Sequence, residues 1–310
     1  MIECRIFRRI GCLLAVVSFV GPGTGHAAES SSNAPTPPLN TVSDASALYA
    51  RAIQYAKGDG VDQDRQKAAE CMRKSAELGY AVAQNDLGVY YAKGLGVPQD
   101  YIEAAKWYRK AAENGDPLGQ YSMGRCCLEG RGVSSNVVES LKWFKMAAAQ
   151  EQPDALLALG YLYMESHQDL PADWKEARQW FQKAVDQGKF GALNPIGFMY
   201  ERGGLGIDQD LNKAIQTYRD AAEKNEPEGQ MNVGRMYYEG LGVRADYQEA
   251  YKWFYVAHSN GSGLANHYLL ELEGQNPAHG AALTREQIQK AIQEAVQIQQ
   301  RLVKSARKPK

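Results

Sequence analysis

The chain has 310 residues, of which 44% are hydrophobic and 23% are charged, and its formal net charge is −1. This near-neutral balance argues against a nucleic-acid partner, which selects a strongly basic face. Beyond residue 27, no apolar stretch is long enough to cross a bilayer of about 30 Å as a helix. The sequence therefore predicts no nucleic-acid partner and no transmembrane segment.

Residues 1–27 have the layout of a secretory signal peptide. Arginines precede the uncharged stretch Ile10–Val20, and Gly25–Ala27 offers a small-x-small cleavage site. The apolar stretch is too short for a membrane span. We expect the chain to be exported, and to be periplasmic or secreted. Residues 28–43 are rich in Ser, Asn and Pro and are predicted to form a disordered linker.

Removing the predicted signal peptide would take away three basic residues and one acidic residue and leave a net charge of −3. It would also leave three cysteines, Cys71, Cys126 and Cys127. An odd number in an exported chain leaves at least one thiol unpaired within the chain. The sequence contains no Cys-x-x-Cys pattern, so we interpret these cysteines as small buried apolar residues rather than as a zinc or redox site.

A short motif, Gly-x-Gly followed by Val or Ile, recurs along the rest of the chain. Its copies stand 36 residues apart, except for one gap of 74 residues that fits two units of 37. The gap therefore contains a copy that has lost the motif, with Ser166–Pro171 in its place. This period predicts six structural repeats. The motif occurs at Gly58–Val61, Gly94–Val97, Gly130–Val133, Gly204–Ile207 and Gly240–Val243.

A second recurring position predicts the start of a helix in every unit. It holds Asp or Asn, and in four units Glu follows three residues later. In that pattern the cap side chain accepts from a free backbone N–H and the Glu reaches back to the N–H of the cap residue. We interpret these acids as helix caps, each contributing about 1 kcal/mol, rather than as metal ligands. The cap positions are Asp64, Asp100, Asn136, Asp173, Asp210 and Asp246.

Each unit reads as two helices. The motif glycine ends the first helix, because glycine readily adopts the left-handed conformation of a helix C-cap. The second helix carries an aromatic pair, as at Trp107 and Tyr108, and ends at Gly115 or its equivalents, with Asn225 as the substitute in one unit. A glycine inside the first helix costs roughly 1 kcal/mol relative to Ala, so its recurrence predicts a close approach between helices. This glycine recurs at Gly88, Gly124, Gly160, Gly197 and Gly234.

The combined pattern between Leu87 and Gly115 is Leu-Gly-x-x-Tyr, then Gly-x-Gly-Val, then Asp, then Ala-x-x-Trp-Tyr-x-Lys-Ala-Ala-x-x-Gly. It resembles the Sel1-like repeat, a relative of the tetratricopeptide repeat, over about residues 44–261. The first unit departs from the pattern with Ala52 for the glycine and Cys71 for the aromatic residue. The fourth lacks the glycine turn, so we expect a longer or looser loop there.

Because a single amphipathic hairpin cannot bury its own face, the units must stack into one continuous core. The sequence thus predicts an all-α fold, a right-handed α-α superhelix or solenoid of about six helix-turn-helix repeats in residues 44–261. Residues 262–303 are predicted to form a partial repeat and a capping helix that begins at the capping box Thr284–Gln287. Residues 304–310 are predicted to be a basic, disordered tail.

No catalytic or metal-binding constellation stands out. The histidines after residue 27 are not spaced as metal-ligand pairs, and the Gly-x-Gly motif ends a helix, whereas a phosphate loop begins one. We predict no catalytic residue, no cofactor and no metal. His167, in the irregular fourth turn, is interpreted as a solvated loop residue. Some exported members of the family are linked to β-lactamase or penicillin-binding activity, so the resemblance leaves a cell-wall hydrolase as the alternative.

Protein binding has a stronger physical basis. Stacked helix pairs curve so that the first helices form the inner, concave wall. In tetratricopeptide units, ligand-facing positions lie two residues before the Leu, two after it and five to six after it. Arg, Tyr and Phe are enriched at binding hot spots, and Arg125 and Arg235 could hold a carboxylate by paired hydrogen bonds. The resemblance therefore predicts a scaffold, of undetermined oligomeric state, that binds a protein or peptide segment in the bacterial cell envelope. The predicted partner-binding residues are Asn85, Tyr121, Arg125, Tyr161, Asn194, Phe198, Arg235 and Tyr238.

Overall fold

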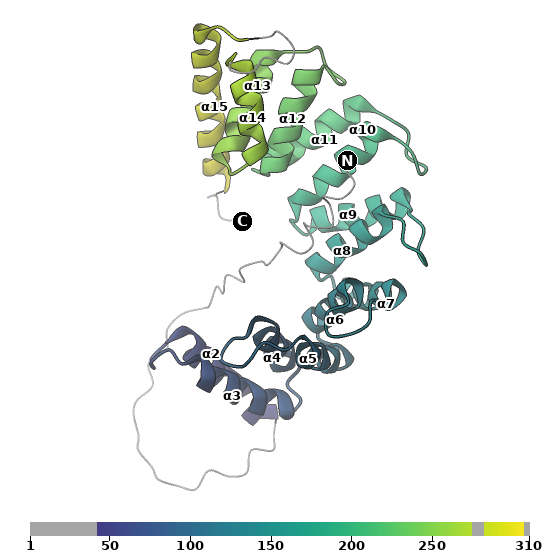
Figure 1. The fold of residues 1–310 in the computed structure, drawn as a ribbon, viewed down its shortest axis with the longest axis vertical. Coiled ribbons are helices and arrows are strands. Elements are labelled where there is room, and N and C mark those ends of the chain that lie inside the picture. The colour runs from purple at the N-terminus through teal and green to yellow at the C-terminus, as the bar shows by residue number, and fades with distance from the viewer. Residues whose placement is uncertain (1–41, 275–281, 307–310) are drawn as a thin grey trace. The chain divides into compact units, whose positions relative to one another are not determined.

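The computed structural model describes residues 42–274 and 282–306, and its regular elements are helices (Figure 1). These residues form the α-helices α2 to α15 and one 3₁₀-helix, η1. Consecutive helices pair as hairpins, which confirms the predicted all-α fold of six hairpin repeats followed by a C-terminal helix. The chain divides into two compact units, one that ends at Asn114 and one that begins at Gly115.

The first unit contains two hairpins, α2 with α3 and α4 with α5, and α3 also packs on α4. Its helices are α2 (Val42–Lys57), α3 (Arg65–Glu77), α4 (Ala81–Lys93) and α5 (Tyr101–Glu113). Helix α2 starts inside the predicted linker, so residues 42 and 43 are helical rather than disordered. The predicted signal peptide and the remainder of that linker lie outside the described residues.

The second unit contains four further hairpins and a C-terminal pair of helices. The hairpins are α6 (Pro117–Glu129) with α7 (Val137–Ala149), α8 (Pro153–Met164) with α9 (Trp174–Asp186), α10 (Leu193–Arg202) with α11 (Leu211–Glu223), and α12 (Pro227–Glu239) with α13 (Tyr247–Ser259). The 3₁₀-helix η1 (Phe190–Ala192) leads into α10. Helices α14 (Gly263–Leu272) and α15 (Arg285–Ala306) complete the unit.

All six predicted caps are helix N-caps in the structure, since each side chain accepts from backbone N–H groups of the first turn. The predicted return hydrogen bond, from the cap N–H to the Glu side chain, is not formed in the repeats. The backbone N–H of each cap donates to a first-helix carbonyl, as Asp173 N does to Tyr163 O at 2.7 Å. The side chain of the Glu three residues later binds within the second helix instead. Glu176 accepts a hydrogen bond from the indole N–H of Trp180 at 2.9 Å.

The glycine inside each first helix lies against an aromatic ring of the second helix. A Cβ built on Gly160 would stand 2.5 Å from the ring of Phe181, and the other four glycines show the same contact at 2.6 Å. The predicted close approach is therefore confirmed. In the first repeat Ala52 takes the glycine position and the fully buried Met72 takes the ring position, so a larger residue on one helix accompanies a more flexible one on the other. The five glycine–ring pairs are Gly88–Tyr108, Gly124–Phe144, Gly160–Phe181, Gly197–Tyr218 and Gly234–Phe254.

The turns of the second, third and sixth repeats end the first helix in the predicted way. Gly94, Gly130 and Gly240 are left-handed C-caps with φ of 68 to 69°. The second glycine of the turn allows close packing on the preceding repeat. A Cβ on Gly242 would stand 2.6 Å from the carbonyl oxygen of Leu211, at the start of α11. Glycine is therefore favoured at both positions of the motif, by the left-handed conformation at the first and by the close backbone contact at the second.

The turns of the fourth and fifth repeats are built differently. His167 and Leu170 exchange two backbone hydrogen bonds, of 2.8 and 3.3 Å, and Gly204 and Ile207 exchange two of 2.7 and 3.0 Å. The fourth turn, residues 165–173, is longer than the regular turn at residues 94–100, as expected, but it is closed by a β-bridge and is not loose. The fifth repeat retains the Gly-x-Gly letters but shares the bridged geometry of the fourth, which its motif did not predict.

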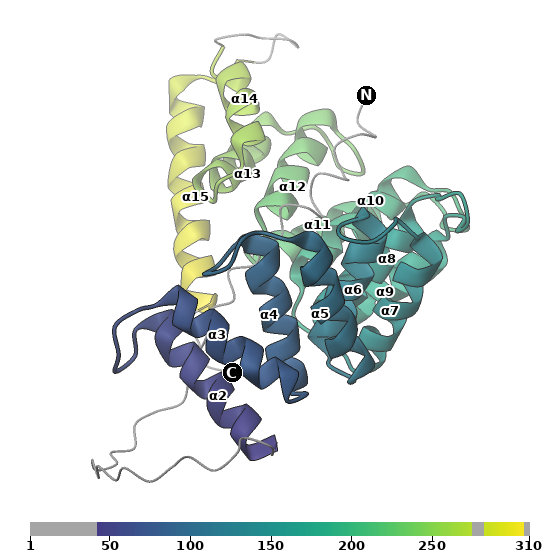
Figure 2. The ribbon, with the colours of Figure 1, turned by 60° about the horizontal axis from the view of Figure 1, so that its bottom comes forward.

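The predicted capping helix is α15, with 22 residues. Thr284 N donates to Gln287 Oε1 at 2.9 Å and Gln287 N donates back to Thr284 Oγ1 at 3.3 Å, which confirms the capping box. Helix α15 packs on α13, with Ala295 fully buried, and lies beside α14 (Figure 2). It continues to Ala306, into the predicted tail. None of the described helices is long and apolar enough to cross a bilayer.

Candidate first-helix binding face

In the second unit, the first helices of four successive repeats expose part of the predicted binding positions. We call this set the first-helix face, on α6, α8, α10 and α12. All of its members are partly exposed, so they combine accessible surface with packing on the core below. They are Tyr121, Arg125, Leu157, Tyr161, Phe198, Met231 and Arg235.

Three of the predicted binding residues contribute little surface. Asn85 and Asn194 are each 5% exposed, and Tyr238 is 7% exposed with its hydroxyl donating to Glu271 at 2.7 Å. Their positions were inferred from spacing alone, which locates a face of a helix but not the depth of each side chain on it. The candidate face therefore depends on the five other predicted residues and on Leu157 and Met231 between them.

The aromatic residues of the face are held by neighbouring rings, two from their own repeats and one from the preceding repeat. Tyr121 packs on Phe144 with ring centroids 5.8 Å apart, and Tyr161 meets Phe181 edge to face at 5.0 Å. Burial raises the pKa of the Tyr121 hydroxyl. Phe198 packs on the indole of Trp174, with centroids 5.9 Å apart. Rings fixed in this way lose little conformational entropy when a partner binds.

Arg125 is already engaged by a carboxylate of its own helix. Its Nη2 lies 2.8 Å from Glu129 Oε1, and Glu129 also pairs with Arg131 at 2.8 Å. The side chain of Arg125 keeps 20% of its surface exposed. The paired hydrogen bonds predicted for a partner's carboxylate are thus supplied within the chain, and a partner would meet an arginine of fixed orientation.

Arg235 links two successive repeats. Its Nη2 lies 2.5 Å from Glu201 on α10 and its Nη1 lies 3.0 Å from Glu239, while the hydroxyl of Tyr218 donates to Glu201 at 2.9 Å. Burial alone would lower the pKa of Arg235, but the hydrogen bond and attraction of Glu201 outweigh it and the pKa is raised. With 21% of its side chain exposed, Arg235 both braces the stack and contributes to the face.

Elsewhere, the described residues offer little that catalysis or metal binding would use. They contain no group of three or more His, Cys, Asp or Glu arranged to hold a metal ion. Within the described residues, Cys71 and Cys126 are free thiols, and burial raises the pKa of Cys126 to about 11, away from the thiolate form that a reactive cysteine needs. Burial lowers the pKa of His167.

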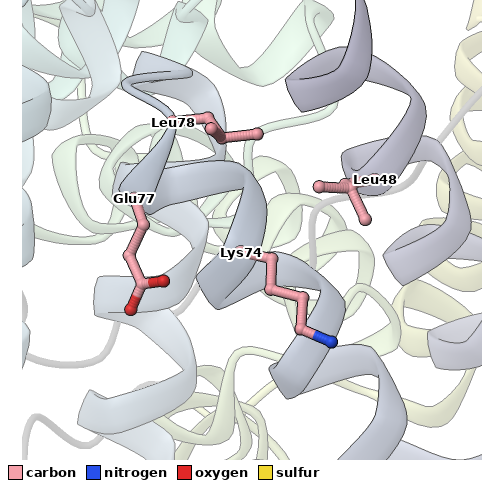
Figure 3. A pocket seen from close by; sticks show the side chains of 4 residues that line it. All are labelled: Leu48, Lys74, Glu77 and Leu78. Carbon is pink, nitrogen blue, oxygen red and sulfur yellow. The ribbon is translucent and has the colours of Figure 1, made fainter. Parts of the chain in front are cut away.

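An open hollow of about 190 Å³ lies between α2 and α3, smaller than the roughly 300–1,000 Å³ of ligand pockets (Figure 3). Leu48 and Leu78 face it, together with Lys74 and Glu77. The second, third and sixth repeats hold an amide pair at the positions of the two leucines, such as Gln84 with Asn114 at 2.8 Å. The hollow therefore lies where the first repeat has two leucines in place of the hydrogen-bonded amide pair of those three repeats.

The Sel1 repeat family matches six consecutive segments, and each contains one of the hairpins described above. The segments are residues 45–80, 81–116, 117–151, 153–189, 192–226 and 227–262. The fold is thus that of an α-solenoid of helix-hairpin repeats. Since the matched segments cover most of the chain, the chain belongs to the Sel1 repeat family.

Two solved structures are similar to this chain. One is a protective antigen of uropathogenic Escherichia coli with an SLR fold, at 31% identity and a TM-score of 0.68 over 82% of this chain. This chain spans 61% of that protein's length. The other is a Sel1 repeat protein from Oxalobacter formigenes, at 30% identity and a TM-score of 0.65, covering 80% of this chain and 96% of that one. The chain matches none of the curated proteins.

The structure adds residues that spacing did not single out. In the first unit, Tyr49 of α2 donates to Asp86 of α4 at 2.9 Å. Tyr49 stands three residues before Ala52, the position that Asn85 holds relative to Gly88. The position three residues before the first-helix glycine would have identified Tyr49 in the first repeat. It was not identified because the first repeat has Ala52 in place of that glycine.

Proposed function

We propose that this chain is an exported scaffold that binds a protein segment through its first-helix face, in the bacterial cell envelope or beyond it. The observation that carries the proposal is the set of aromatic, aliphatic and arginine side chains held partly exposed on four successive first helices. Aromatic residues, methionine and arginine are enriched at protein interfaces, and tyrosine and arginine at their hot spots. Repeats that present one helix each suit an extended partner, since successive repeats offer equivalent positions along it.

Fixed side chains support the same function. Tyr121, Tyr161 and Phe198 pack on rings, and Arg125 and Arg235 are held by carboxylates. A preorganised face loses less freedom on association, so more of the contact energy remains as affinity. Family membership is consistent with a scaffold, and the export step rests on the N-terminal sequence pattern.

Site-specific photo-crosslinking in intact cells tests the proposal. A photoreactive phenylalanine replaces Tyr161 or Phe198 on the first-helix face, and Met146 on α7, 47% exposed, serves as the second-helix control. We expect a discrete adduct from positions 161 and 198 and none from position 146. An adduct from position 146 alone would place the partner on the opposite helices and contradict the proposal. In a second experiment, Tyr161→Ala and Arg125→Ala should each weaken capture of the identified partner.

A further inference from the structure

The first unit carries a partly buried carboxylate that lacks a basic partner. Asp86 lies on α4, beside the predicted binding position Asn85, and is partly exposed. Its Oδ2 accepts from the hydroxyl of Tyr49 at 2.9 Å and its Oδ1 accepts from the side-chain amide of Asn85 at 3.3 Å. Among the described residues, no Lys, Arg or His pairs with it.

The first-helix carboxylates of the second unit provide the contrast. Glu129 pairs with Arg125, Glu201 with Arg235, and Asp154 with Lys189 at 2.7 Å. In each of these three pairs the partly buried carboxylate is balanced by a cation of the chain. Asp86 has two neutral donors instead, so its negative charge is solvated by hydrogen bonds but is not neutralised.

Two tyrosines lie near this carboxylate, and a third packs on one of them. Tyr49 packs edge to face on Tyr80, with ring centroids 5.4 Å apart, and Tyr90 follows Asp86 by one helical turn. Burial and the charge of Asp86 together raise the pKa of Tyr90. All three tyrosines are partly exposed. A carboxylate near tyrosine rings can attract a cation in two ways, through its own charge and through the negative faces of the rings.

Each carboxylate oxygen of Asp86 also keeps acceptor capacity. An ionised carboxylate offers about four lone-pair sites, and Tyr49 and Asn85 occupy one on each oxygen. A guanidinium or ammonium group can therefore bind without displacing either donor. We propose that Asp86, flanked by Tyr49 and Tyr90, anchors a Lys or Arg side chain of the bound protein segment. The inference rests on the proposed function and defines the chemistry of the partner.

The folded state gains nothing from this charge. Burial raises the pKa of Asp86 above its ordinary value, so ionisation is less favourable in the folded chain than in the unfolded chain. Stability contributed at this residue is therefore lost as the pH rises through the raised pKa. The groups facing Asp86 are Tyr49 of α2 and Asn85 and Tyr90 of α4, with Tyr80 packed on Tyr49 and Arg65 near Tyr90. Asp86→Asn keeps the shape and should raise the melting temperature at neutral pH.

A displayed library of random 12-residue peptides, selected on the immobilised chain, tests the proposal. We expect the selected peptides to share one Lys or Arg, and titration calorimetry to show a tenfold or larger loss of affinity for Asp86→Asn. Replacing the shared basic residue by norleucine in the peptide should cause a similar loss, and the two losses should not add. Asp59→Asn, at an exposed carboxylate of the same unit, should leave the affinity unchanged.

The alternative outcomes separate this inference from the proposed function. Peptides that bind without a basic residue, or that bind Asp86→Asn as tightly as the unmodified chain, would overturn the role of Asp86 and leave the scaffold function standing. Failure to select any peptide would count against both. Because Asp86→Asn is expected to be more stable, a lower melting temperature in that variant would also contradict the assignment.

Discussion

The turns of the third and sixth repeats and those of the fourth and fifth connect the same kind of hairpin by different backbone routes. In the former, Gly130 or Gly240 ends the first helix in the left-handed conformation. In the latter, a β-bridge closes the turn, as between Gly204 and Ile207. In both kinds of repeat the cap N–H donates to the same first-helix position, with Asp210 N bonded to Tyr200 O and Asp246 N to Tyr237 O. The shared hydrogen bond, rather than the turn, thus fixes where the second helix begins.

The largest effect should come from the second glycine of the turn. Gly242→Ala would place a Cβ 2.6 Å from the backbone oxygen of Leu211, whereas Gly206→Ala would meet only the end of the Lys175 side chain at 2.6 Å. Both positions have positive φ, which costs about 1–2 kcal/mol for Ala. The backbone clash adds roughly 1–3 kcal/mol at Gly242 alone. We expect urea denaturation to show the larger loss for Gly242→Ala, and equal losses would contradict the distinction between the turns.

The glycine inside the first helix should behave alike in both kinds of repeat. Gly124→Ala and Gly160→Ala each drive a Cβ into a core ring. Overpacking costs about 1–3 kcal/mol, and the better helix propensity of Ala returns about 1 kcal/mol, so we expect a net loss of up to about 2 kcal/mol in each variant.

The first repeat supplies the compensating change, because Ala52 is paired there with Met72. Adding Phe181→Met to Gly160→Ala should recover part of the lost stability, measured by the same denaturation. No recovery would indicate that the ring contributes more through its own burial than through its fit to glycine.

Most of the fold could be predicted because it depends on residues that recur in register. The glycine column, the caps and the capping box at Thr284 each have a steric or hydrogen-bonding reason that acts within a few residues of sequence. The bridged fifth turn could not be predicted, because Gly204–Ile207 has the same letters as a regular motif and only the extra residue Gly203, with φ of 64° and ψ of 169°, changes its path.

The candidate site was less predictable than the fold. Spacing placed Tyr161 and Phe198 at positions that are partly exposed in the structure, yet it could not show that Asn194 is buried or that Glu201 engages Arg235. Those features depend on contacts between residues 34 positions apart, which a local pattern does not contain.

The helix caps should have equal effects in the two kinds of repeat. Asp173→Ala in a bridged repeat and Asp246→Ala in a regular one each remove a side-chain acceptor for the N–H of a Glu three residues on. Loss of such a cap costs about 1 kcal/mol. Hydrogen exchange should show faster opening at the start of α9 or α13, respectively. Asn at either position would be the matched control, since Asn136 caps α7.

The smallest expected effect is a gain, and it depends directly on the geometry of the bridged turn. Leu205 is 54% exposed and has a φ of 47°, a left-handed conformation that costs a leucine about 1–2 kcal/mol. Asn tolerates that conformation, so Leu205→Asn should stabilise the second unit by about 0.5–1 kcal/mol, seen as a higher denaturation midpoint. Leu241, at the same place in a regular turn, has no positive φ and packs on the core, so Leu241→Asn should give no gain. A gain at both positions would mean that the substitution acts through solubility or the unfolded chain rather than through the left-handed turn. A gain at Leu205 alone would show that the bridged turn holds an apolar residue in a conformation that the fold itself does not favour.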